Sequence, residues 1–96
     1  MRRRKVDPLR IDKFLKVSRI IKRRTVARSA CESGRVFVNG NVAKPGREVD
    51  AGDRVIVEFG NRTLEIEILE IRTHVPAARA PELYRVIRED YREDER

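Results

Sequence analysis

The first apolar residues of the chain recur at helical spacing. Ile11, Phe14 and Leu15 follow an i, i+3, i+4 pattern, which predicts a buried stripe along one side of a helix. Asp7 stands just before this pattern and is followed by a proline, a pair that is typical of a helix N-cap and first helical position. We therefore expect a first helix that begins at this pair and ends near Ser18.

A second helix is indicated by four small apolar residues further along the chain. Thr25 is suited to cap its start, and Gly34 is suited to the position just past its end, where a positive φ is needed. Small side chains would allow this helix to pack closely against the first. The four residues are Val26, Ala27, Ala30 and Cys31.

After the second helix the apolar spacing changes from helical to alternating. Val36 and Val38 would point to one side of a strand. The Asn-Gly pair at 39–40 is a strong signal for a hairpin with a type I′ turn, and residues 41–43 then form the returning strand.

Two longer strands are predicted beyond this hairpin. Residues 44–53 are rich in Pro, Gly and Asp and read as a loop. Apolar residues then alternate over 55–59 and again over 62–71, on either side of a Gly-Asn turn. The alternation slips between Ile68 and Leu69, so we expect a β-bulge or strong twist there.

The C-terminal part of the sequence has a helical spacing again. Residues 73–80 read as a linker, and Pro81 is suited to open a helix. Leu83, Ile87 and Tyr91 are spaced by four and would dock one side of that helix on the domain. The complete pattern predicts an α+β fold with two packed helices, a small antiparallel sheet and a C-terminal helix.

Charge is distributed unequally along these 96 residues, a length that suits one domain. Residues 1–47 carry 15 Lys and Arg against 3 Asp and Glu, whereas residues 48–96 carry 8 against 13. A one-sided positive field attracts polyanions and speeds their encounter, and nucleic acid is the commonest such partner. Acidic proteins and anionic membranes remain alternatives at this point.

The reactive residues of the sequence are too few for most enzyme chemistry. Cys31 is the only cysteine and His74 the only histidine, which excludes an internal disulfide and leaves no catalytic triad or metal-ligand spacing. We expect no catalytic residue, no metal and no cofactor. No apolar run approaches the roughly 20 residues of a membrane span, so we expect a cytoplasmic protein that does not contact membranes.

Four short motifs stand together in residues 10–59: "RIDKFL" at the start, Arg24-Thr25 at the entry to the second helix, "SGRVFVNG" at the hairpin and "KPGREVDAGD" after it. With these motifs the stretch resembles the S4 RNA-binding domain, which has a helix pair followed by a hairpin (the alpha-L motif). It implies three regions: a basic arm and helix start at 1–9, the S4 core at 10–59, and a partner strand, C-terminal helix and charged tail at 60–96.

Among S4 proteins the chain is most similar to the stand-alone RqcP (YabO) family, with a more distant likeness to the small heat-shock S4 protein. The resemblance implies binding to large ribosomal subunits that hold peptidyl-tRNA, through both ribosomal RNA and tRNA. It further implies support for the C-terminal alanine tailing of stalled chains by a partner factor. We expect the protein to act as a monomer.

The candidate RNA-binding residues are the basic side chains of the helical part and one lysine of the loop after the hairpin. Arg suits a planar grip on phosphate, and Lys acts as a point charge. Arg24 is central because it matches the family's entry to the second helix. The set is Arg10, Lys13, Lys16, Arg19, Lys22, Arg23, Arg24, Arg28 and Lys44.

Other residues and functions stay open at this stage. Phe37 could stack on a base or pack under the C-terminal helix, and Asp12 could pair with Lys16 four residues later. A general ribosome-assembly or RNA-chaperone factor, a DNA-binding protein and an accessory subunit of a modification enzyme are the alternative functions.

Overall fold

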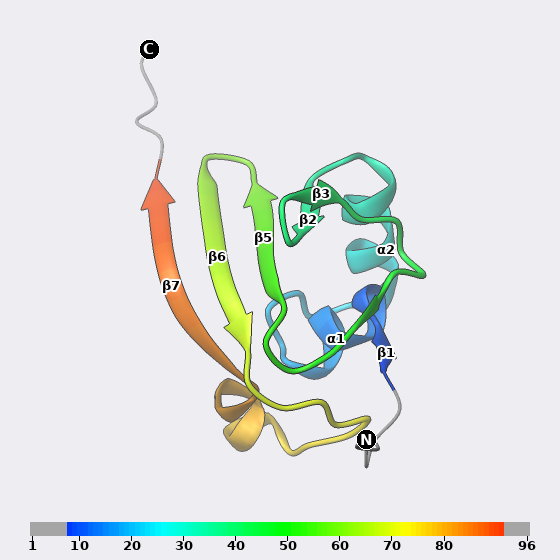
Figure 1. Cartoon of the computed structure of the whole chain (residues 1–96), viewed down its shortest axis with the longest axis vertical. Helices are drawn as coiled ribbons and strands as arrows, with labels where there is room; N and C mark the ends of the chain where they lie inside the picture. The colour runs from blue at the N-terminus through cyan, green and yellow to red at the C-terminus, as the bar shows by residue number, and fades with distance from the viewer. Residues whose placement is uncertain (1–7, 92–96) are drawn as a thin grey trace, which may run out of the picture.

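The structure, a computed structural model, describes residues 8–91. Asp7, the basic arm and the end of the charged tail lie outside the described residues. Within residues 8–91 the chain forms two α-helices, one 3₁₀ helix and seven strands. The helices α1 (Ile11–Val17) and α2 (Arg24–Glu32) pack against each other at one side of the molecule (Figure 1).

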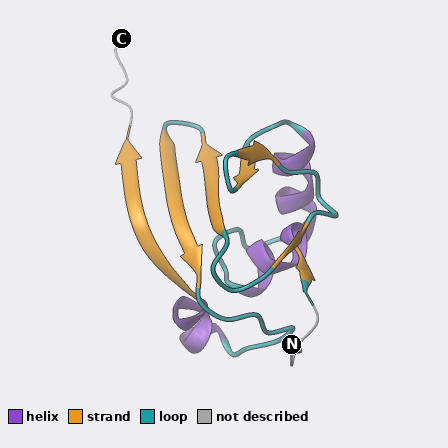
Figure 2. Ribbon diagram, viewed as in Figure 1, coloured by secondary structure: helices purple, strands orange, loops and turns teal. Residues whose placement is uncertain are grey.

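The strands form one five-stranded antiparallel sheet and one short two-stranded pair. The order in the larger sheet is β3-β2-β5-β6-β7, so β3 and β7 are its edges. Figure 2 shows the α-helices gathered beside the β2–β5 part and the 3₁₀ helix η1 (Ala77–Leu83) at the base of β7. The strands are β1 (Leu9–Arg10), β2 (Val36–Val38), β3 (Asn41–Val42), β4 (Glu48–Val49), β5 (Arg54–Phe59), β6 (Arg62–Ile68) and β7 (Tyr84–Tyr91).

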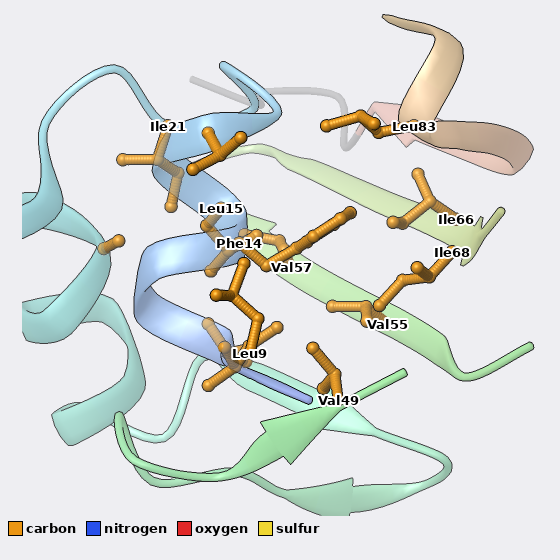
Figure 3. Packing of buried hydrophobic residues seen from close by; sticks show 14 of the residues in the cluster. Leu9, Phe14, Leu15, Ile21, Val49, Val55, Val57, Ile66, Ile68 and Leu83 are labelled. Carbon is orange, nitrogen blue, oxygen red and sulfur yellow. The ribbon is translucent and has the colours of Figure 1, made fainter. Parts of the chain in front are cut away.

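The core lies between α1 and the inner side of the sheet. Phe14 is fully buried and reaches from α1 toward Val57 on β5 (Figure 3). Ile66 and Ile68 line the same side from β6 and are equally buried. The predicted α+β fold of two packed helices and a small antiparallel sheet is therefore confirmed, as are the alternating strands 55–59 and the inward residues of β6.

The local turn signals of the S4-like region also agree with the structure. Asn39 and Gly40 have φ values of 51° and 87°, as a type I′ turn requires, and Gly34 has a φ of 77° at the end of α2. Ala27 and Cys31 are buried as expected. Val26 is not, because it faces solvent with 51% of its surface exposed.

The expected starts of both helices are wrong. Leu9 and Arg10 pair with β4 in a strand, so α1 begins at Ile11 rather than at the Asp-Pro pair. The N–H of Ile11 donates to the Arg47 carbonyl at 2.7 Å, and the next N–H donates to the Pro45 carbonyl. Loop carbonyls cannot accept these bonds unless the loop returns to α1, which the local sequence does not reveal. Likewise α2 begins at Arg24, without a capping side chain.

The predicted loop and bulge also need correction. The stretch 44–53 contains β4, which pairs with β1 across about forty residues. The bulge does not lie between Ile68 and Leu69, because β6 simply ends at Ile68. The register shift occurs between Glu65 and Ile66, where β7 has one extra residue.

The helix expected after Pro81 is wrong: this segment forms η1 and then strand β7. Leu83 ends η1 and is buried, while Tyr84–Tyr91 pairs antiparallel with β6. The open edge of β6 supplies backbone partners along this whole segment. The bulge at Ile87 breaks the two-residue alternation of β7, and the broken pattern resembles a four-residue helical spacing.

Without a C-terminal helix, Phe37 cannot pack under one. It lies on the outer side of the sheet, paired with Val42 on β3 and Ile56 on β5. Phe37 is half-buried in this row. Base stacking on Phe37 stays a hypothesis.

The contrast between η1 and β7 predicts different responses to truncation. Leu83→Ala should lower the free energy of unfolding by about 2–5 kcal/mol, because Leu83 is 1% exposed and its removal leaves a cavity. Val86→Ala should lower it by less than about 1 kcal/mol, because Val86 is 49% exposed on β7. Urea unfolding of both variants measures this. Equal losses would contradict the strand, since a docked helix would bury both residues.

Candidate nucleic-acid interface

The predicted basic residues come from three consecutive pieces of the helical half. Arg10 precedes α1, and Lys13 and Lys16 lie on α1. Two further arginines, Arg24 and Arg28, lie on α2. The connecting turn supplies three more, and Lys44 follows β3. All are exposed except Lys13, which is half-buried; the remaining members are Arg19, Lys22 and Arg23.

Three of these arginines meet in one open hollow of about 320 Å³ between the starts of the two helices. Arg10 enters it from β1, just before α1, and Arg24 and Arg28 enter it from α2. The other lining residues are Thr25 and Asp12. Arg10 is fourteen positions from Arg24 and eighteen from Arg28 in the sequence. The three arginines therefore meet only because the two helices pack against each other.

Asp12 holds two of the three arginines. Arg10 donates from Nε to Oδ1 at 3.2 Å and from Nη2 to Oδ2 at 3.0 Å, a two-pronged pair. Arg24 donates from Nη2 to Oδ1 at 3.4 Å. The expected pair of Asp12 with Lys16 is thus wrong. Side chains on a helix lean toward its N-terminus, so the carboxylate lies beside Arg10 and the start of α2.

Burial differs sharply across this cluster. The Asp12 side chain is 2% exposed, whereas those of Arg10 and Arg24 are 49% and 46% exposed. Each guanidinium therefore uses one edge for the carboxylate and keeps its other N–H donors toward solvent. This arrangement can present two fixed positive groups to one external anion.

Charge neutralisation separates the two halves of the molecule. Five of the six arginines between positions 54 and 88 pair with a carboxylate, for example Arg62 with Glu89 and Arg85 with Glu67. Within residues 8–91, by contrast, Lys16, Lys22 and Arg23 make no ion pair. The positive charge of these sheet arginines is cancelled locally, whereas the charges of Lys16, Lys22 and Arg23 are left available.

Two predicted residues stand apart from the hollow. Arg19 lies in the turn after α1 with a φ of 65°, and its Nη2 donates to the Val75 carbonyl at 3.4 Å. Part of its donor capacity thus ties the turn to the loop before η1. Lys44 is exposed beside Pro45, whose carbonyl contacts the start of α1.

Sequence reasoning missed Thr25 and Asp12 as members of the site. Thr25 was assigned to a cap, although the helix begins one residue earlier. Asp12 was assigned to a local pair. A usable signal was present: residues 8–47 contain 11 Lys and Arg but only Asp12 and Glu32 as acids, and the first of these lies within the apolar stripe of α1.

Potential catalytic groups have no suitable surroundings. Cys31 is 2% exposed, and burial, with the nearby Asp12 and Glu32 carboxylates, raises the pKa of its thiol to about 11. The thiol is therefore protonated at neutral pH and is a poor nucleophile. Among the described residues, no three His, Cys, Asp or Glu side chains gather as a metal site requires. None of the helices between residues 8 and 91 is long and apolar enough to cross a bilayer.

A helix pair, a following hairpin and a basic hollow at the helix starts define an S4-domain protein, and the S4 domain family matches residues 9–55. The fold also agrees with the solved structure titled "Trimeric structure of Vibrio cholerae Heat Shock Protein 15". The two structures share a TM-score of 0.78 and 34% sequence identity over 83% of this chain and 82% of the other.

The chain belongs to the family of bacterial RQC P-site tRNA stabilizing factors. It is 49% identical over 82 residues to the member from Halalkalibacterium halodurans, which covers 85% of this chain and 93% of that protein. It is 42% identical over 88 residues to the member from Listeria monocytogenes, which covers 92% and 96%. The resemblance to the stand-alone S4 family and to the heat-shock S4 protein is thus confirmed.

The raised thiol pKa predicts a pH dependence of stability. The folded state holds the Cys31 proton up to about pH 11, whereas an ordinary free thiol has a pKa of 9.0. The contribution of the protonated Cys31 thiol to the free energy of unfolding is thus complete below pH 9 and is lost as pH rises toward 11. Cys31→Ala should reduce the alkaline loss of unfolding free energy by roughly 1–3 kcal/mol. Urea unfolding of both proteins across this range measures it; identical alkaline losses would contradict the assignment.

Proposed function

We propose that this protein binds the large ribosomal subunit together with peptidyl-tRNA and supports ribosome-associated quality control. Membership of its family and the S4 domain support ribosome-associated RNA binding. The relatives from Halalkalibacterium halodurans and Listeria monocytogenes are named as factors that stabilise tRNA in the P site. The contribution of the chain in this proposal is binding rather than catalysis, in the cytoplasm where ribosomes act.

The observation that carries the proposal is the positive surface of the helical half, where Lys and Arg far outnumber the two acids Asp12 and Glu32. Arg10 and Arg24 are held half-exposed in the hollow, while Lys16 and Lys22 are exposed elsewhere on the helical half. A planar guanidinium grips phosphate through two parallel N–H groups, and lysines add attraction without fixed geometry. Such a surface suits the closely spaced phosphates of folded RNA.

The finer parts of the proposal concern partners. Binding of ribosomal RNA and tRNA together would hold peptidyl-tRNA on a stalled large subunit while a partner factor adds C-terminal alanines. The basic set predicted from the sequence, from Arg10 to Arg28 with Lys44, is proposed to contact RNA phosphates. A monomer would suffice, because β1, α1 and α2 of one chain supply all the residues that line the hollow.

A gradient experiment tests the function directly. Native cell lysate is sedimented through sucrose, and each fraction is probed for this protein and for peptidyl-tRNA. We expect the protein to comigrate with large subunits that carry peptidyl-tRNA. Residence on small subunits, or in light fractions at low salt, would contradict the quality-control function. Comparable affinity of the purified protein for many unrelated RNAs would instead favour a general RNA chaperone or assembly factor.

Arg24 should contribute strongly to this binding and weakly to folding. Arg24→Ala removes one guanidinium from the hollow but leaves Asp12 paired with Arg10. We expect affinity for large subunits to fall about tenfold, and the slope of log affinity against log salt to decrease by about one phosphate contact. The melting temperature should change little.

Arg85→Ala is the matched control, because Arg85 is similarly exposed but pairs with Glu67 on the sheet half. This variant should bind as the wild type does. Equal weakening by both substitutions would show that net charge alone, rather than the hollow, determines affinity. Loss of folding in Arg24→Ala would contradict the assignment of Arg24 to a surface contact.

A further inference from the structure

A buried carboxylate is an unexpected component of a surface that attracts polyanions. Asp12 is 1% exposed, and its negatively charged side chain lines the hollow although the proposed ligand is also negative. Removing a charge from water is costly unless it is paired and hydrogen-bonded. A nearby acid also weakens phosphate attraction by simple Coulombic reasoning. Its presence therefore calls for a compensating role.

Capping of its own helix does not explain the carboxylate. The first N–H groups of α1 are satisfied by the Arg47 and Pro45 carbonyls, and no side chain caps this helix. Every hydrogen bond that the Asp12 side chain makes within residues 8–91 comes from Arg10 or Arg24. The carboxylate is thus directed wholly toward these two guanidinium groups.

We propose that Asp12 is a positioning residue: its buried carboxylate fixes Arg10 and Arg24 so that their exposed edges receive an RNA phosphate, and it thereby raises RNA affinity although it is negative. The inference rests on the proposed function. A free arginine has many rotamers, and ordering it on binding costs affinity. The shared carboxylate orders both arginines before RNA arrives, and it also ties the start of α1 to that of α2.

Asp12→Asn tests this inference because the two explanations predict opposite signs. The substitution makes the surface more positive, so an electrostatic surface without fixed geometry should bind RNA more tightly. A surface that depends on positioning should bind more weakly, because an amide cannot accept three bonds from two cations. We expect about tenfold weaker binding to purified tRNA.

Glu32→Gln is the matched control. Glu32 lies on α2, makes an ion pair with Arg28 at 3.3 Å, and is exposed together with its partner. The substitution changes net charge by the same amount on the same half of the molecule, but it removes no buried acceptor. We expect binding equal to or tighter than that of the wild type. If Asp12→Asn also binds tRNA as tightly as the wild type or more tightly, the inference is overturned.

A spectroscopic signature separates positioning from a general loss of structure. The Nε–H of Arg10 donates to Asp12, so its ¹⁵N–¹H signal should exchange slowly with solvent in the wild type and in Glu32→Gln. It should exchange rapidly in Asp12→Asn while the backbone spectrum stays native. An Arg10 Nε–H signal that exchanges rapidly in the wild type would overturn the inference.

A second variant keeps the test decisive if Asp12→Asn does not fold. Arg10→Lys combined with Arg24→Lys retains both positive charges but lacks the planar fork that meets the carboxylate. We expect tRNA binding about tenfold weaker than in the wild type, with the fold retained because Asp12 is unchanged. Unchanged affinity in the double lysine variant would overturn the inference.

Failure of the inference can be distinguished from failure of the proposed function. The ratio of tRNA affinities between variant and wild type tests positioning, whereas binding of the wild type to purified large subunits tests the function. If the wild type binds tRNA but not large subunits, the ribosomal function is rejected. The ratio of variant to wild-type tRNA affinities can then still be measured, and it still tests positioning. Wild-type binding to neither would reject both.

Discussion

The burial of one side of α1 against the sheet is the constraint on which the rest of this structure depends. A helix of seven residues is too short to be stable alone, so tertiary packing must hold it. Ile11, Phe14 and Leu15 are completely buried and fix its rotation. Of the other positions of α1, Asp12 and Val17 are also buried, Lys13 is half-buried and Lys16 faces solvent. Because α2 packs beside α1, Arg10, which stands just before α1, shares one hollow with Arg24 and Arg28 of α2.

Much of the S4-like half could be predicted because its signals are local. The stripe of α1, the small residues of α2 and the Asn39-Gly40 turn each depend on a few neighbouring residues. The C-terminal segment could not be predicted in this way. Its conformation depends on the open edge of β6, which lies about twenty residues earlier, and on a bulge that hides the alternation of β7. The pairing of β1 with β4 is likewise a long-range contact.

The candidate site could be predicted in composition but not in geometry. Unequal charge along the sequence identifies the helical half, and the exposure of its basic residues agrees with that expectation. Which side chains meet is decided by the crossing of the helices. Asp12 seemed to belong to Lys16 because both are in the same helix, yet its partners are Arg10 and Arg24, and the second is twelve residues away. Local pairing rules cannot detect such a contact.

The two kinds of cation on this surface have different physical consequences. Lysines such as Lys16 and Lys22 are exposed and unpaired within the described chain, so they contribute a long-range field that speeds encounter with any polyanion. Arg10 and Arg24 have lost part of their freedom to Asp12, so they favour anions that fit between them. Ion pairs in the sheet half cancel positive charge there, which restricts attraction to one side of the molecule. A ligand is thus attracted by the field and selected by the fixed pair, and the buried acid separates these two roles.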